Sequence, residues 1–116
     1  MRAIRGAISV EKNNRTEILQ STKELLEYII KENAISTEEM VSITFTATDD
    51  LDSVYPAVAA RELGLDKVPL LCFQEMRVKN SLRKCIRVML YVSRNCPLDE
   101  IKHVYLKKAA YLRPDL

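Results

Sequence analysis

The sequence is poor in several residues that specialised sites require. It has only two glycines in 116 residues, no tryptophan, a single histidine and three cysteines. Two distant glycines cannot form the glycine-rich loop that cradles phosphates in nucleotide-binding proteins. The cysteines are odd in number and show no CxxC spacing, so neither a zinc site nor a disulfide scaffold is expected. We therefore expect no metal ion and no cofactor, and a reducing, cytoplasmic compartment.

Long hydrophobic runs and a charge of one sign are also lacking. No apolar run reaches the roughly 18 residues that a membrane span needs, and the interrupted start MRAIRGAISV is not typical of a signal peptide. Lysine and arginine total 18 against 16 acidic residues, which is too balanced for a nucleic-acid-binding protein. The length suits one domain, residues 1–116, with a real hydrophobic core.

Hydrophobic periodicity predicts five strands and two helices. Alternating or continuous apolar patterns predict strands at 2–10, 41–48, 67–72, 84–92 and 101–106. A stripe of 3.6-residue period predicts a helix from Arg15 to Glu32, with Asn14 and Glu17 as its capping box. A shorter helix fits between Pro56 and Gly64. This order predicts an α+β fold with one mixed sheet, packed by one long and one short helix.

The fourth predicted strand is apolar at both odd and even positions, apart from Arg87. Such a pattern indicates that both faces of the strand are covered. Two helices are too little cover for the whole sheet, so we expect a neighbouring subunit to cover part of it. A buried arginine also requires an anionic partner, because an unpaired buried charge costs several kcal/mol.

Four arginines occupy positions that are otherwise apolar. Arg5 interrupts the first strand, Arg87 the fourth, Arg61 lies on an alanine-rich helix, and Arg113 lies in the tail. A planar guanidinium binds a carboxylate through two hydrogen bonds and stays charged, so these residues would suit a small polyanion. The alternatives are a solvated Arg61 and an internal ion pair between Arg87 and Glu75.

Other combinations of reactive residues are weaker. Cys72 and His103 lack a third residue that would orient them, so a thiol nucleophile is not favoured. Cys85 is interpreted as a small buried hydrophobic residue, and His103 as a histidine on the strand surface. Tyr105 could be a core tyrosine whose hydroxyl finds a partner. The residues alone thus indicate a small oligomeric α+β domain that binds a small anion through arginines.

Six segments resemble the monofunctional chorismate mutases of the trimeric, non-helical class. They are IRGAISVE, ILQSTKELLEYIIKEN, VYPAVAARELG, VPLLCFQEM, KCIRVML and HVYLKKAAYLRPDL. The resemblance runs from Arg2 to Leu116. It implies an isomerase that converts chorismate to prephenate by a Claisen rearrangement, a step toward phenylalanine and tyrosine. It also implies a homotrimer with a barrel-like core and active sites at the subunit interfaces.

The resemblance also implies roles for individual residues. Arg87 would face the ether oxygen of the substrate, and Glu75 would accept a hydrogen bond from its ring hydroxyl. Arg5 and Tyr105 would contact the substrate carboxylates. The remaining positions implied to line the site are Tyr55, Ala57, Arg61, Leu71, Cys72, Phe73, Gln74, Leu112 and Arg113. This chain departs from the residue that is common in the family at three positions. Tyr55 stands where phenylalanine is common, Val58 where lysine is common, and Leu71 where threonine is common.

Two rival functions use the same residues. The first is a non-catalytic trimer that binds a small carboxylate metabolite through the arginines. The second is a general acid–base enzyme that uses Glu75 and Cys72. Turnover of chorismate distinguishes the first rival from the mutase, and a dependence on thiol ionisation would favour the second.

Overall fold

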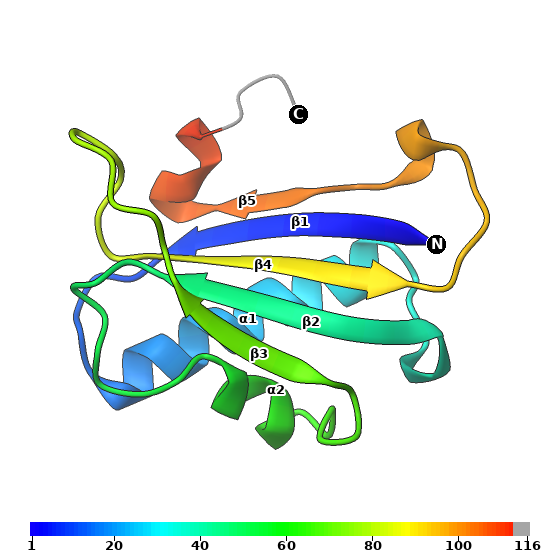
Figure 1. Ribbon diagram of the computed structural model, residues 1–116, viewed down its shortest axis with the longest axis horizontal. Helices are drawn as coiled ribbons and strands as arrows, with labels where there is room; N and C mark the ends of the chain where they lie inside the picture. The colour runs from blue at the N-terminus through cyan, green and yellow to red at the C-terminus, as the bar shows by residue number, and fades with distance from the viewer. Residues whose placement is uncertain (113–116) are drawn as a thin grey trace.

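The computed structural model describes residues 1–112 of the chain. Within that range, five strands form one mixed sheet in the order β3-β2-β4-β1-β5 (Figure 1). The strands and α-helices are β1 Arg2–Ser9, α1 Arg15–Glu32, β2 Met40–Ala47, α2 Ala57–Glu62, β3 Leu70–Gln74, β4 Cys85–Val92 and β5 Val104–Leu106. β4 is antiparallel to both of its neighbours, whereas the edge strands β3 and β5 are parallel to β2 and β1. The predicted α+β fold is confirmed.

The two helices lie on the same face of the sheet. Figure 1 shows α1 and α2 behind the strands, with no helix in front of β4 and β2. The side chains that alternate toward the helices form the core, including Ile4 and Ile8 of β1, Phe45 of β2 and Ile86 of β4, all fully buried. We call this side the covered face and the opposite side the open face.

Capping explains why α1 begins and ends where the sequence predicts. The Asn14 side chain accepts a hydrogen bond from the Glu17 backbone N–H at 2.8 Å, which satisfies one of the free amides of the first turn. At the other end, Asn33 donates its backbone N–H to the carbonyl of Ile29. Only half of the predicted capping box is present, because the Glu17 carboxylate contacts the Asn14 amide group and not its backbone N–H.

Gly6 lets β1 approach α1 closely. A Cβ atom at this position would lie 2.6 Å from Cδ1 of Ile29 and 3.1 Å from Cδ1 of Leu25. Glycine in a strand interior often marks such a close approach. The glycine of the IRGA segment therefore serves the packing of the covered face.

Two strands differ from their predicted bounds by more than one residue. β3 begins at Leu70 and continues to Gln74, later than the predicted range of 67–72. β5 is limited to Val104–Leu106, although the apolar pattern began at Ile101. The backbone of Lys102 is bonded to the side chain of Asn33 and does not join the strand ladder.

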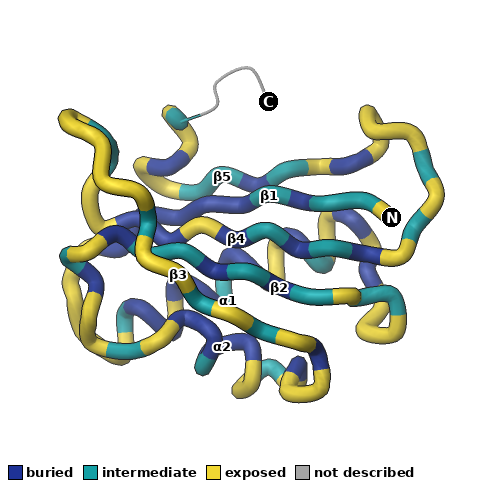
Figure 2. Tube along the Cα trace, in the orientation of Figure 1, coloured by how far each residue is buried: buried dark blue, intermediate teal, exposed yellow. Residues whose placement is uncertain are grey.

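Within residues 1–112, only one face of β4 is packed against the helices; cover of its other face by a neighbouring subunit stays a prediction. Ile86, Leu90 and Val92 are buried against the helices, but the Arg87 side chain is 44% exposed on the open face. Figure 2 shows the same alternation of buried and less buried residues along the central strands. Apolar residues at both odd and even positions of a strand indicate that both of its faces are to be buried. They do not indicate whether the same chain or another subunit buries them.

Candidate active site

A pocket of about 260 Å³ lies on the open face of the sheet. Its lining residues are Arg5, Gly6, Thr44, Thr46, Glu75, Arg87, Val88, Met89 and Tyr105. The register of the strands brings together those of its side chains that project from the open face, because directly paired residues project from the same face. Thr46 and Ala7 flank Arg87, Met89 pairs with Arg5, and Ala7 pairs with Tyr105. The pocket thus contains the four residues to which the family resemblance assigns specific substrate contacts.

Arg87 and Glu75 form an ion pair within this pocket. Nε of Arg87 lies 3.3 Å from Oε2 of Glu75, so the internal pair considered from the sequence is present. The Glu75 backbone N–H donates to the Ala47 carbonyl at 2.8 Å, which anchors the residue just beyond β3. A guanidinium held at Nε can still donate its Nη groups to a ligand. The pair therefore orients Arg87 and leaves it able to bind an oxygen.

Thr46 is a pocket residue that the sequence reasoning missed. Its hydroxyl donates to Oε2 of Glu75 at 2.6 Å, the same oxygen that contacts Arg87. The alternation of threonines at 44, 46 and 48 with apolar residues indicated a polar face of this strand. The pattern could not show that Glu75, 29 positions later, would lie opposite the middle threonine.

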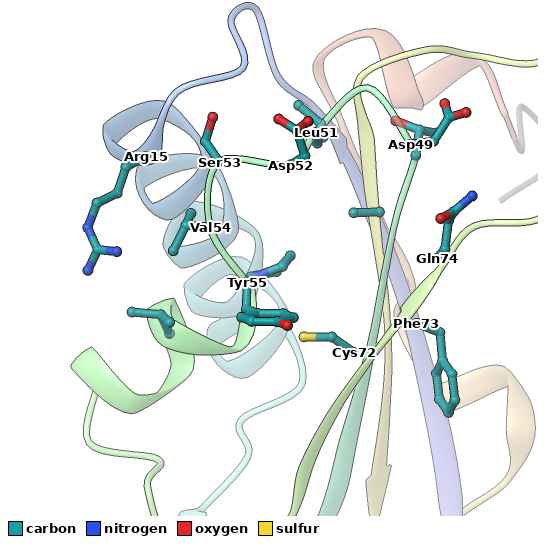
Figure 3. Close-up of a pocket in the computed structure, with 14 residues that line it drawn as sticks. Arg15, Asp49, Leu51, Asp52, Ser53, Val54, Tyr55, Cys72, Phe73 and Gln74 are labelled. Carbon is teal, nitrogen blue, oxygen red and sulfur yellow. The ribbon is translucent and has the colours of Figure 1, made fainter.

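A second, larger pocket of about 620 Å³ lies between β3 and the loop that leads into α2. Figure 3 shows Cys72 pointing toward Tyr55 in this pocket, whereas Phe73 points away from them. Gln74 also lines it. Tyr55 is 72% exposed, so its ring is available to another molecule.

The predicted site residues therefore form two groups in the described chain. Arg5, Glu75, Arg87 and Tyr105 line the open-face pocket, and Tyr55, Cys72, Phe73 and Gln74 line the second pocket. Neither pocket contains residues of both groups.

The other predicted positions lie around these two groups. Ala57 is buried at the start of α2, Arg61 is exposed on α2, and Leu71 is exposed on β3 opposite Thr44. Leu112 packs beside Tyr105 against a small buried cluster that includes Ala7, Cys85 and Ala109. Arg113 lies outside the described residues.

Burial keeps the thiols of Cys72 and Cys85 protonated. Burial raises the pKa of Cys72, and the Ala57 backbone N–H and the charge of Arg61 offset this only in part. Burial also raises the pKa of Cys85 to about 11. A protonated thiol is a poor base and a poor nucleophile, which counts against the acid–base rival that relies on Cys72.

Residues 1–112 offer neither a metal-ligand cluster nor a membrane-spanning helix. Among these residues, no three His, Cys, Asp or Glu side chains gather closely enough to hold a metal ion. None of the helices there has the length and apolar character that crossing a membrane requires.

The open-face pocket of this α+β fold is lined by two arginines and a glutamate, charged groups that would suit a small anionic molecule. The chain belongs to the chorismate mutase type I family, whose model matches residues 1–116. It is accordingly a chorismate mutase, which is an isomerase.

Similar proteins of known name agree with this assignment. The chain is 53% identical over 117 residues to chorismate mutase AroH of Bacillus subtilis (strain 168), covering all of this chain and 92% of the relative. It is 46% identical to chorismate mutase AroH of Thermus thermophilus, covering 96% of that protein. Its structure matches the solved chorismate mutase Cth-682 from Clostridium thermocellum with a TM-score of 0.93 and 42% identity, over 96% of this chain and 99% of that one.

Proposed function

We propose that the protein rearranges chorismate to prephenate, a step toward phenylalanine and tyrosine, in the open-face pocket. The reaction breaks one C–O bond and forms one C–C bond in a single concerted step. It needs no nucleophile and no proton transfer. The protein must hold a compact conformer of the substrate and direct positive charge at the ether oxygen, which becomes electron-rich in the transition state.

Arg87 is the residue that we assign to the ether oxygen. The supporting observation is its position at the centre of the sheet, in a strand bonded on both sides, with its guanidinium oriented by Glu75 at 3.3 Å. A cation that is already oriented before the reaction requires little reorganisation as charge develops. Because that charge is larger in the transition state than in the substrate, Arg87 would raise the rate and not only the affinity.

The other pocket residues would bind the parts of the substrate that do not react. Arg5 and Tyr105 line the pocket beside Arg87 and suit the two carboxylates of the substrate. Glu75, which receives a hydrogen bond from Thr46, would accept another from the ring hydroxyl of the substrate. These contacts would select the compact conformer in which the two reacting carbons meet.

We further propose that the enzyme is a homotrimer whose active site combines residues of two subunits. Among residues 1–112, no α-helix covers the open face of β2 and β4, and large apolar side chains are exposed on and beside β3, namely Leu71, Phe73, Met76 and Val78. A neighbouring subunit on this face would bury them. It could also bring Tyr55, Ala57, Arg61, Cys72, Gln74, Leu112 and Arg113 to the substrate.

Chorismate turnover is the direct test of the function. Addition of chorismate to the purified protein should cause its ultraviolet absorbance to decay much faster than in buffer. No decay would contradict the proposal and favour the non-catalytic binder of a small carboxylate.

A mixing experiment tests the shared site. Light scattering should give three times the mass of the chain. Arg87→Ala and Arg61→Ala proteins should each be nearly inactive, and unfolding and refolding them together should restore part of the activity. Such rescue arises because some interfaces then receive an intact copy of both residues. A monomeric mass would contradict the trimer, and an absence of rescue would contradict the shared site.

We also propose that the chain is a single domain and that it resides in the cytoplasm. Residues 1–116 would be one domain, which is supported by a single sheet that contains both the first and the last strand. The cytoplasm is the proposed compartment, which is supported by the three free thiols of Cys72, Cys85 and Cys96.

A further inference from the structure

The short edge strand β5 carries one of the proposed substrate contacts, Tyr105. It pairs with only three residues of β1, Gly6 to Ile8. Hydrogen bonds to side chains hold the chain in place just before and just after β5. Asn33 donates to the Lys102 carbonyl and accepts its N–H, both at 2.8 Å. After the strand, the Lys108 N–H donates to the hydroxyl of Ser9 at 3.0 Å.

His103 supplies the remaining link between these two strands. Its Nδ1 accepts the backbone N–H of Arg5 at 2.9 Å, one residue before the ladder between β1 and β5 begins. The imidazole ring therefore takes the place of a main-chain acceptor. Turning the ring over would put a carbon opposite the amide, so the hydrogen bond itself assigns the nitrogen. Only a ring with an unprotonated Nδ1 can accept it.

We propose that His103, in its neutral form, is a positioning residue that fixes Arg5 and Tyr105 for substrate binding. The amide that it binds belongs to Arg5, and Tyr105 follows His103 by two residues on the same segment. Both residues line the open-face pocket. The proposal rests on the proposed function of that pocket, but the hydrogen bond can be tested without substrate.

Protonation of His103 would break this link. An imidazolium carries N–H groups on both nitrogens, so one of them would face the N–H of Arg5. Among residues 1–112, the titratable groups that line the hollow beside His103 are Tyr28 and Glu32 of α1, and Lys102 and Tyr105 of its own segment; the lining residue of the last helical turn is the uncharged Ala110. The chain has a single histidine, which makes its ring resonances simple to assign.

Two substitutions and one control separate the hydrogen bond from simple packing. His103→Asn keeps an acceptor at the same position along the side chain, since Oδ1 replaces Nδ1, and it does not titrate. His103→Ala removes the acceptor. Lys102→Ala is the matched control, because it removes an exposed neighbouring charge and leaves the hydrogen bond intact.

Steady-state kinetics with chorismate should be measured at about pH 8, where an unperturbed imidazole is neutral. His103→Ala should raise KM about tenfold and change kcat less, because it loosens groups that bind substrate and transition state alike. His103→Asn and Lys102→Ala should stay within about twofold of the unmodified protein. An unchanged KM in His103→Ala, or an equal rise of KM in His103→Asn, would overturn the proposal.

Nuclear magnetic resonance tests the link without substrate. At about pH 8, the His103 ring should be protonated at Nε2 and unprotonated at Nδ1. Amide exchange at Arg5 should accelerate in His103→Ala and remain slow in His103→Asn, while the amide of Ile29 in α1 is unaffected. A failure of chorismate turnover with these results intact would refute only the proposed function. A protonated Nδ1, or unchanged exchange at Arg5 in His103→Ala, would refute the role of His103.

Discussion

One face of the sheet packs against the helices and the other lines a pocket, and the adjacent residues Arg5 and Gly6 of β1 show this contrast. Gly6 faces α1 so closely that a methyl group would lie 2.6 Å from Ile29. Arg5 faces the opposite side and lines the open-face pocket. Because side chains alternate along a strand, one segment can serve packing and binding at once. Changes on the open face should thus affect catalysis, and changes on the covered face should affect stability.

Replacement of Arg87 should give the largest effect on catalysis. Arg87→Ala should lower kcat at least about 100-fold, because it removes the preorganised donor at the ether oxygen. The free energy of unfolding should change by less than about 1 kcal/mol, since partly exposed ion pairs contribute little. Steady-state kinetics and urea denaturation measure the two quantities. Arg87→Lys should also be severely impaired if guanidinium geometry matters, and near-normal turnover in Arg87→Ala would refute the assignment.

Glu75 and Thr46 should follow with smaller losses. Glu75→Ala should lower kcat/KM by about 10-fold to 100-fold, the range expected for a hydrogen bond to a charged group. Thr46→Val should cost about threefold to tenfold, because it frees Oε2 of Glu75 from its hydroxyl partner.

A double variant checks that Thr46 acts through Glu75. Thr46→Val combined with Glu75→Ala should be no worse than Glu75→Ala alone, and Thr46→Ser should remain close to normal. Additive losses in the double variant would show that Thr46 acts independently of Glu75.

Gly6 tests the packing of the covered face, and Gly64, just after α2, provides a comparison. Gly6→Ala should destabilise the fold by about 1–3 kcal/mol through overpacking against Ile29. Gly64→Ala should cost about 1 kcal/mol for a different reason, because its φ of +89° is unfavourable for alanine and nothing lies within 4 Å of the added atom. Ile29→Val removes the crowded methyl group, so it should partly rescue Gly6→Ala and not Gly64→Ala in thermal melts.

Replacement of the thiol of Cys72 should give the smallest effect. Cys72→Ser should keep kcat within about threefold, because burial holds the thiol protonated by raising its pKa and the rearrangement transfers no proton. The rate of the unmodified protein should also not rise with alkaline pH as thiolate forms. A rate that followed thiol ionisation and disappeared in Cys72→Ser would instead support acid–base catalysis.

Local sequence signals were sufficient for the helices. The predicted bounds of α1 are correct because Asn14 and Asn33 satisfy its end groups locally. α2 lies between Pro56 and Gly64, as expected from a residue that favours helix starts and one that favours their ends. β5 was predicted too long because Asn33, about 70 positions away, binds the backbone of Lys102. No local pattern could reveal that contact.

The sequence by itself determined the order of the elements, the alternation of the strands and the presence of arginines at apolar positions. It also carried the family motifs, because they are continuous segments. Only the tertiary structure decided that Arg87 faces an open side of the sheet, that Glu75 and Thr46 meet it there, and that His103 binds the amide of Arg5. These contacts join residues far apart in the chain, and strand register, which depends on the packing of the whole sheet, brings them together.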